Sequence, residues 1–317
     1  MLTPQPEIAI LRRSIEMGLM LPDEEPLHIA VTLYLPPADR LATPAMVLFC
    51  LPGGGVTRDY FDLGGEASGL SFARALAMQG FVVATFDPIG VGESSRPKDG
   101  FALTSETVMR CHAAATDAVT AQLRDGSLSP DVPPLPHFRK VGVGHSLGAM
   151  ITILQQVERR DYEALALLCF GTIGMPQVLS DVEREALKAP DGGRSRLAEL
   201  ARIRFGGDAY SRVPRSVGES AASRALGAVQ DRVLAVASMQ AIMPGNVAPK
   251  AAELDVPLFL GVGENDMVGP PHSLPAEYPA CPDLTLYVVA GARHHPFVAE
   301  GAGALFARIG GWLRGLP

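Results

Sequence analysis

A serine between two glycines is the residue whose surroundings most clearly indicate chemistry in this sequence. Ser146 is the centre of Gly144-His145-Ser146-Leu147-Gly148, a GxSxG pattern that follows an apolar run and precedes a helical pattern. A serine on such a sharp strand-to-helix turn exposes its hydroxyl, and the flanking glycines avoid clashes with the neighbouring strand and helix. The pattern therefore predicts that Ser146 is a nucleophile, although the same letters also occur in ordinary glycine-rich turns.

A serine hydroxyl needs a nearby base whose pKa is close to neutrality, which favours histidine. Two adjacent histidines, His294 and His295, lie between the last apolar run and the final helical pattern. Because His294 comes first after the run, we predict that it is the base, and His295 remains the alternative. The remaining histidines, including His145 beside the serine, are expected to be structural or exposed.

A catalytic histidine needs a carboxylate that fixes its tautomer and stabilises its charged form. Asp266 follows the apolar run that starts at Pro257 and precedes His294 in the chain. We predict that Asp266 is this acid. Glu264 is the alternative, but it is so close to the run that it is expected to face solvent or a loop amide.

The oxyanion that forms during acyl transfer needs two preorganised N–H donors. One is expected to be the Leu147 amide, at the start of the helix that follows the serine. The other is expected in the loop Pro52-Gly53-Gly54-Gly55, which follows the first buried apolar run. We predict Gly54 as this donor and keep Gly55 as the alternative.

These residues need a scaffold that brings several strand ends together, and the hydrophobic pattern predicts one. Short apolar runs alternate with amphipathic stretches along most of the chain, which is typical of a parallel sheet covered by helices. An antiparallel pair is expected first, at 15–20 and 28–35, with its turn at 22–26. The predicted buried strands start near residues 45, 81, 140, 164, 257 and 284, and the predicted helices are 66–79, 104–124, 147–159 and 299–313.

One segment interrupts this alternation. Residues 172–250 contain no buried apolar run and show helical patches at 182–188, 195–204 and 221–239, separated by glycine and proline. We interpret this segment as a helical insertion between two strands. The prediction is a core domain formed by residues 1–171 and 251–317, with 172–250 as a helical cap or lid.

The order Ser146, Asp266, His294 and its placement after strands resemble the α/β-hydrolase fold family over nearly the whole chain. Two further segments are similar to loops of that family, the D-x-x-G-x-G-x-S run from Asp87 and the acid-bearing turn GENDMVGP. The resemblance implies an α/β fold with a mostly parallel central sheet and a cap that covers the pocket. The sequence departs from many esterases of the family at Pro52, where those enzymes have a histidine.

Composition and charge narrow the class of partner. The chain has 317 residues, 47% hydrophobic and 19% charged, which excludes wholesale disorder. Its net charge of −7 and its lack of basic runs make nucleic acid and anionic membranes poor partners. Charged residues interrupt the apolar stretch near the N-terminus, so a cytoplasmic location is expected. The four scattered cysteines are expected to be buried thiols: Cys50, Cys111, Cys169 and Cys281.

The function that these features predict is hydrolysis of a carboxylic ester, lactone or thioester of a hydrophobic small molecule through an acyl-enzyme on Ser146. No cofactor or metal is expected, since the sequence shows no motif for one. A homodimer is expected only because such assemblies are common. Two alternatives stay open: acyl transfer, C–C or amide bond hydrolysis by the same residues, and a ligand-binding protein that has the fold without the activity.

Overall fold

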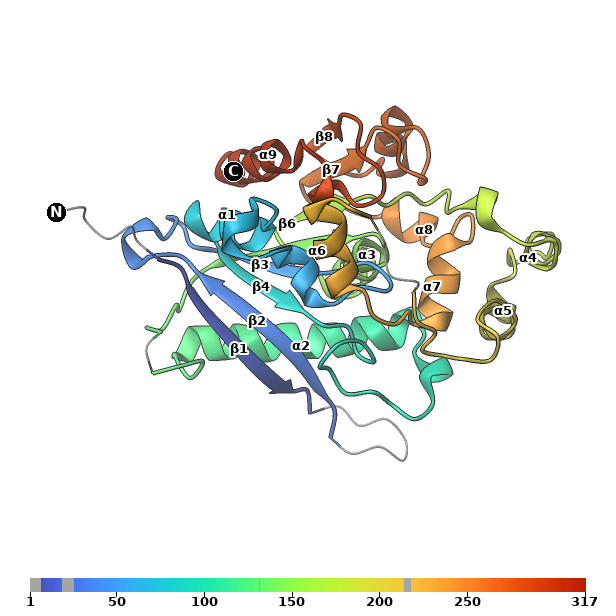
Figure 1. Ribbon diagram of the computed structural model, residues 1–317, viewed down its shortest axis with the longest axis horizontal. Helices are drawn as coiled ribbons and strands as arrows, with labels where there is room; N and C mark the ends of the chain where they lie inside the picture. Colours follow the sequence, from blue (N-terminus) through green and yellow to red (C-terminus); the bar gives the residue numbers. More distant parts are fainter. Residues whose placement is uncertain (1–6, 19–25, 131, 214–217) are drawn as a thin grey trace.

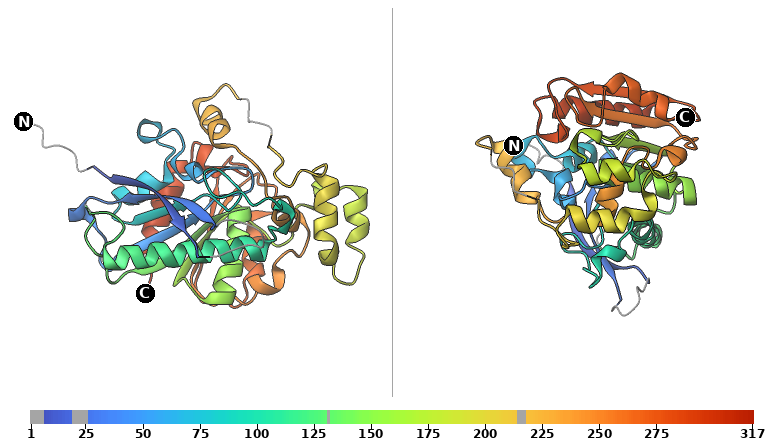
Figure 2. Two further views of the ribbon diagram at one scale, coloured as in Figure 1. Left: turned by 90° about the horizontal axis from the view of Figure 1, so that it is seen from below. Right: turned by 90° about the vertical axis from the view of Figure 1, so that its right-hand side faces the viewer.

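The computed structural model describes residues 7–18, 26–130, 132–213 and 218–317. Its centre is an eight-stranded sheet with helices on both faces (Figures 1 and 2). The strands are β1 (Ala9–Glu16), β2 (His28–Leu35), β3 (Met46–Leu51), β4 (Val82–Phe86), β5 (Arg139–His145), β6 (Ala164–Leu168), β7 (Leu258–Gly263) and β8 (Leu284–Val289). Their order in the sheet is β1-β2-β4-β3-β5-β6-β7-β8. β2 is antiparallel to both β1 and β4, and every other pair is parallel.

The sheet separates two hydrophobic layers because its central strands are apolar on both faces. In β3, for example, Val47, Phe49 and Leu51 belong to one layer, whereas Met46 and Leu48 belong to the other. The first layer is covered by α2 (Ser105–Asp125) and α3 (Leu147–Arg159), and the second by α1 (Phe72–Met78) and α9 (Ala302–Arg314). Figure 1 shows α2 on one side of the sheet and α1 with α9 on the other.

The predicted α/β class and mostly parallel sheet flanked by helices are confirmed, but two predicted elements and the burial of one cysteine differ from expectation. β1 is Ala9–Glu16 rather than 15–20, because an edge strand tolerates both arginines: Arg12 is exposed, and the partly buried Arg13 donates to the Leu128 carbonyl at 3.0 Å. Most of the expected turn at 22–26 lies outside the described residues. The helix expected at 66–79 begins only at Phe72, because Gly69 has a left-handed φ of 69° and ends a short 3-10 turn before it. Cys281 is partly exposed, unlike the other three cysteines.

Residues 172–250 contain the helices α4 (Asp181–Ala186), α5 (Leu197–Arg204), α6 (Ala221–Val229), α7 (Ala235–Ile242) and α8 (Ala248–Ala251). The helix predicted at 221–239 is wrong as a single element. It breaks at Gln230, which forms a β-bridge with Val56 in the loop after β3, so that α6 and α7 are separate. α4 and α5 project at one end of the molecule (Figure 2, left), and they share a small apolar cluster of their own with α7.

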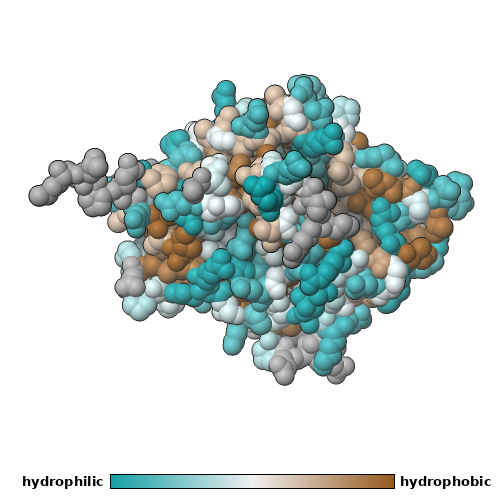
Figure 3. Space-filling model, viewed as in Figure 1, coloured by the Kyte–Doolittle hydropathy of each residue, from teal (hydrophilic) through white to brown (hydrophobic). Residues whose placement is uncertain are grey.

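Several apolar side chains lie on the outside of that projecting end. Val182 on α4 and Ile203 on α5 are 47% and 54% exposed. Figure 3 shows hydrophobic colouring at the same end of the molecule, among hydrophilic residues. Among the helices of the described residues, none is both long and apolar enough to cross a membrane.

Candidate active site

Ser146 occupies a strained turn between β5 and α3. Its φ of 52° is in the left-handed region, which costs a non-glycine residue about 1–3 kcal/mol. The flanking glycines are sterically required. A Cβ on Gly144 would lie 2.4 Å from the Ala149 Cα, and one on Gly148 would lie 2.1 Å from the Leu51 carbonyl oxygen. The packing of β3, β5 and α3 therefore holds the serine hydroxyl out at the carboxyl edge of the sheet.

The structure brings together the three residues predicted to form the catalytic unit. The His294 Nε2 is 2.8 Å from the Ser146 Oγ, and the His294 Nδ1 is 2.8 Å from the Asp266 Oδ1. They follow β5, β7 and β8, whose parallel carboxyl ends meet at one edge of the sheet. The Nδ1–H donates to the carboxylate, so that Nε2 faces the serine hydroxyl with its lone pair. This arrangement is suited to removing the hydroxyl proton.

The environment of Asp266 keeps its carboxylate ionised. Burial alone would raise its pKa, but hydrogen bonds from His294, the Cys169 thiol and the Val268 amide outweigh burial and hold the pKa below its ordinary value. Cys169 follows β6 and has a φ of 51°, a second strained position at this edge. Sequence reasoning assigned Cys169 no role beyond a buried thiol, because only the fold places it against the acid.

Among the described residues, His295, the alternative base, forms no hydrogen bond with Ser146 or Asp266, whereas His294 bonds to both. It packs edge-on against Tyr60 with 5.6 Å between ring centroids. Burial, reinforced by the neighbouring His294, lowers its pKa to about 4, so that it is neutral at pH 7. Glu264, the alternative acid, accepts a hydrogen bond from the Gly291 amide at 2.8 Å and so stabilises a loop, as expected.

His145 supports the candidate base through the backbone. It is fully buried, and its Nε2 is 2.8 Å from the carbonyl oxygen of His294, to which it donates. Its ring stacks on Tyr60 with 4.6 Å between centroids. Burial lowers the pKa of His145 well below its ordinary value, which keeps it neutral. We interpret His145 as a positioning residue; its place beside the nucleophile was the only signal of this in the sequence.

The glycine-rich loop after β3 lies against the nucleophile. A Cβ on Gly53 would be 3.2 Å from the Ser146 Cβ, and one on Gly54 would be 3.6 Å from the Leu147 Cδ2. The Leu147 N–H is in the first turn of α3 and has no acceptor within the helix. Gly55 is turned toward the insertion, since its carbonyl accepts from the Asp231 amide at 2.8 Å. This placement favours Gly54 and Leu147 as the oxyanion donors, and their role stays a prediction.

A buried ion pair anchors the same loop. Arg58 is 2% exposed and forms ion pairs with Asp87, which follows β4, and with Glu93. The Arg58 amide also donates to the Asp87 Oδ1 at 2.7 Å. A Cβ on Gly92 would lie 2.2 Å from the Asp87 Oδ2. This close approach explains why the second glycine of the D-x-x-G-x-G-x-S run has to be a glycine. This run therefore fixes the loop that carries Gly54.

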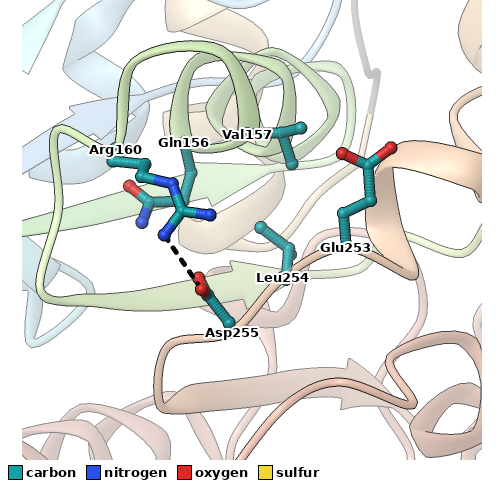
Figure 4. A pocket seen from close by; sticks show the side chains of 6 residues that line it. All are labelled: Gln156, Val157, Arg160, Glu253, Leu254 and Asp255. Atoms are coloured by element: carbon teal, nitrogen blue, oxygen red, sulfur yellow. Dashed lines mark hydrogen bonds and ion pairs between the residues drawn. The ribbon is translucent and has the colours of Figure 1, made fainter.

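A hollow of about 270 Å³ lies at the other edge of the sheet, between the end of α3 and the segment before β7. Figure 4 shows its lining, in which Arg160 Nη1 and Asp255 Oδ2 form an ion pair at 3.0 Å. None of the three predicted catalytic residues is among the described residues that line it. We assign it no part in the chemistry.

Comparison with known proteins agrees with this geometry. A family model described as "Alpha/beta hydrolase family" matches residues 47–308. The chain therefore belongs to the alpha/beta hydrolase family, and it is an enzyme of the hydrolase class. No curated protein matches its sequence.

Solved structures of the same fold are similar over nearly the whole chain, at low sequence identity. A bromoperoxidase from Bacillus anthracis is 16% identical with a TM-score of 0.61, over 96% of this chain and 99% of that one. An esterase from Thermogutta terrifontis is 18% identical with a TM-score of 0.59, over 96% and 98%. An epoxide hydrolase from Vigna radiata is 13% identical with a TM-score of 0.59, over 97% and 98%. At these identities the likeness concerns the fold alone.

Proposed function

We propose that this enzyme is a serine hydrolase that cleaves a carboxylic ester, lactone or thioester of a hydrophobic small molecule. The observation that carries the proposal is the chain of two 2.8 Å hydrogen bonds from Ser146 through His294 to Asp266. A serine at this position favours a mechanism through an acyl-enzyme. Formation of an alkyl-enzyme ester would instead use an aspartate as the nucleophile.

In the first half of the reaction, the Ser146 Oγ bonds to the acyl carbon while its proton moves to the His294 Nε2. The Leu147 and Gly54 amides bind the oxyanion. The bond from the acyl carbon to the leaving oxygen or sulfur then breaks, and His294 gives the proton to that atom. In the second half, water attacks the acyl-enzyme, His294 takes its proton, and the serine oxygen leaves with that proton.

We propose that residues 172–250 act as the cap over this site. The support is direct bonding to the loop that carries Gly54: the Thr57 amide donates to the Val229 carbonyl at 2.9 Å, and the Asp231 amide donates to that of Gly55 at 2.8 Å. α7 contributes Ser238, whose Oγ would lie 3.3 Å from a Cβ on Gly54.

The test is hydrolysis of 4-nitrophenyl butyrate and butyryl thioesters by the wild type and by Ser146→Ala, with products identified by mass spectrometry. We expect free butyric acid from the wild type and a loss of about 10⁴-fold or more in kcat for the variant. Ser273→Ala, at an exposed serine, is the matched control and should keep full activity. Equal rates for Ser146→Ala and the wild type would contradict the proposal.

A further inference from the structure

A hollow of about 960 Å³ lies beside the candidate base. Three segments form its walls: α6, the loop after β7, and the loop between β8 and α9. Asn265 and Met267, on either side of the candidate acid, line it together with His294 itself. In Figure 1, α6 lies next to the C-terminal segment that carries these loops. The hollow is therefore bordered by His294, the candidate base.

The side chains of this hollow suit an apolar group that ends in an anion. Leu226, Met267 and Val298 provide apolar wall, and Arg293 and Asn265 provide donors. None of the described residues that line the hollow has a carboxylate, although the chain has 34 acidic residues against 27 basic ones. A positive hollow in an acidic protein favours negatively charged ligands over neutral ones.

The Arg293 guanidinium is available for a ligand. Arg293 is exposed and, within the described part of the chain, it makes no hydrogen bond or ion pair. Other arginines, such as Arg159 and Arg204, are paired with carboxylates. The nearby Glu264 carboxylate is engaged by the Gly291 amide at 2.8 Å. A planar guanidinium without a partner can bind a carboxylate or phosphate through two parallel hydrogen bonds.

The main chain at Arg293 is tied to the loop of the candidate acid. The Asn265 amide donates to the Ala292 carbonyl at 2.8 Å, which ties the loop of the acid to the loop of the base. Arg293 lies in the chain between Ala292, which accepts that bond, and His294, so the bond holds its main chain beside the base. Asn265, whose side chain also lines the hollow, stands on the other side of the same bond.

The place of the hollow beside His294 relates it to the leaving half of a substrate. Acylation requires His294 to protonate the leaving atom, so this atom departs next to the His294 Nε2. Gly53 of the loop that carries Gly54 approaches the Ser146 Cβ, and none of the described residues that line the hollow belongs to that loop. We propose that the hollow holds the leaving group and that Arg293, with Asn265, binds an anionic oxygen substituent on it. This inference rests on the proposed function and adds to it the substrate class, acyl compounds with an anionic leaving group.

The test compares substrates that share an acyl group and differ only in one anionic substituent. One pair is 4-nitrophenyl butyrate and 3-carboxy-4-nitrophenyl butyrate, and the other is the butyryl thioesters of pantetheine and 4′-phosphopantetheine. We expect the wild type to prefer the anionic member of at least one pair in kcat/KM, and the pair that shows it identifies carboxylate or phosphate. Arg293→Gln should lower kcat/KM for that anionic substrate by about 10-fold. For the neutral substrate of the same pair, kcat/KM should change by less than about two-fold.

Arg110→Gln is the matched control, because Arg110 is an exposed arginine on α2, outside the lining of the hollow. This substitution should leave kcat/KM unchanged for both substrates of the pair. Equal kcat/KM for the members of both pairs, or an equal loss for both members in Arg293→Gln, would overturn the inference and leave the proposed function standing. Absence of hydrolysis for all four compounds would instead overturn the proposed function.

Discussion

Two adjacent histidines of the same loop have opposite environments, and this difference separates the candidate base from its neighbour. His294 bridges Ser146 and Asp266, whereas His295 packs on Tyr60, and its buried Nδ1 has no hydrogen-bond partner among the described residues. A base must be able to take a proton near neutral pH. His295, with its pKa lowered to about 4, is poorly suited to that task.

The two substitutions at this loop are therefore expected to differ strongly. His294→Ala should lower kcat by about 10⁴-fold or more, as expected when the residues act as a unit. His295→Asn should keep kcat within about 10-fold, since it removes packing and no proton transfer. Steady-state kinetics on 4-nitrophenyl butyrate, with circular dichroism to check folding, would compare them. A severe loss for His295→Asn in a folded protein would reverse the assignment.

At the scale of elements, the loop that carries Gly54 is held from two sides. The ion pair of Arg58 and Asp87 ties it to the end of β4, and the bridge from Val56 to Gln230 ties it to the insertion. Gly92 adds a hydrogen bond to the Asp231 carboxylate at 2.8 Å. Hydrogen bonds thus join residues 172–250 to the loop that carries Gly54 and to the loop after β4.

Removing one partner of the buried ion pair is expected to be costly, because both side chains are nearly inaccessible to solvent. Arg58→Met would leave the Asp87 carboxylate buried without its charge partner, and we expect it to lower the free energy of unfolding by about 3–5 kcal/mol. Urea denaturation at pH 7 would measure this. Arg160→Met, at an exposed ion pair, should cost less than about 1 kcal/mol.

Arg58→Met combined with Asp87→Asn should be less destabilising than Arg58→Met alone, because no charge then remains buried. A cost below about 1 kcal/mol for Arg58→Met would show that the pair does not hold the loop. The measurement concerns folding and is independent of the substrate.

Much of the fold could be predicted because the apolar runs mark its strands. The run before Ser146 and the glycines around it indicated the turn, and α3 begins at Leu147, as expected. Asp266 and His294 could be selected because each follows such a run, and parallel strands bring their carboxyl ends to one edge. The sequence could not show that His145 donates to the His294 carbonyl, or that Gln230 breaks a helix, because these contacts join residues distant in the chain.

At the scale of the whole molecule, the buried His112 and His145 and the partly buried His295 couple stability to pH. Burial lowers the pKa of His112 and of His295 to about 4, and that of His145 well below its ordinary value. His112 lies away from the active site, where its Nδ1 is 2.7 Å from the Gln155 Oε1. In the unfolded chain each histidine would titrate near pH 6.5.

The unfolded state therefore binds more protons than the folded state between about pH 6.5 and 4. The contribution of these neutral histidines is fully present above pH 6.5 and is lost as the pH falls toward 4. For His112 alone this loss is about 3 kcal/mol. Urea denaturation from pH 7 to pH 4 should show the decline, and His112→Asn should make it shallower.

His137→Asn, at an exposed histidine, should leave the pH dependence of unfolding unchanged. Identical pH profiles for His112→Asn and the wild type would contradict this account of acid sensitivity.

The central claim is that Ser146 is an activated nucleophile. Labelling with a fluorophosphonate probe, followed by peptide mass spectrometry, tests it without knowledge of the substrate, because the probe forms a covalent bond with an activated serine. We expect one modified peptide, with the label on Ser146, and no label on the folded Ser146→Ala variant. Folded wild-type protein that takes up no label, or takes it up at another serine, would contradict the claim.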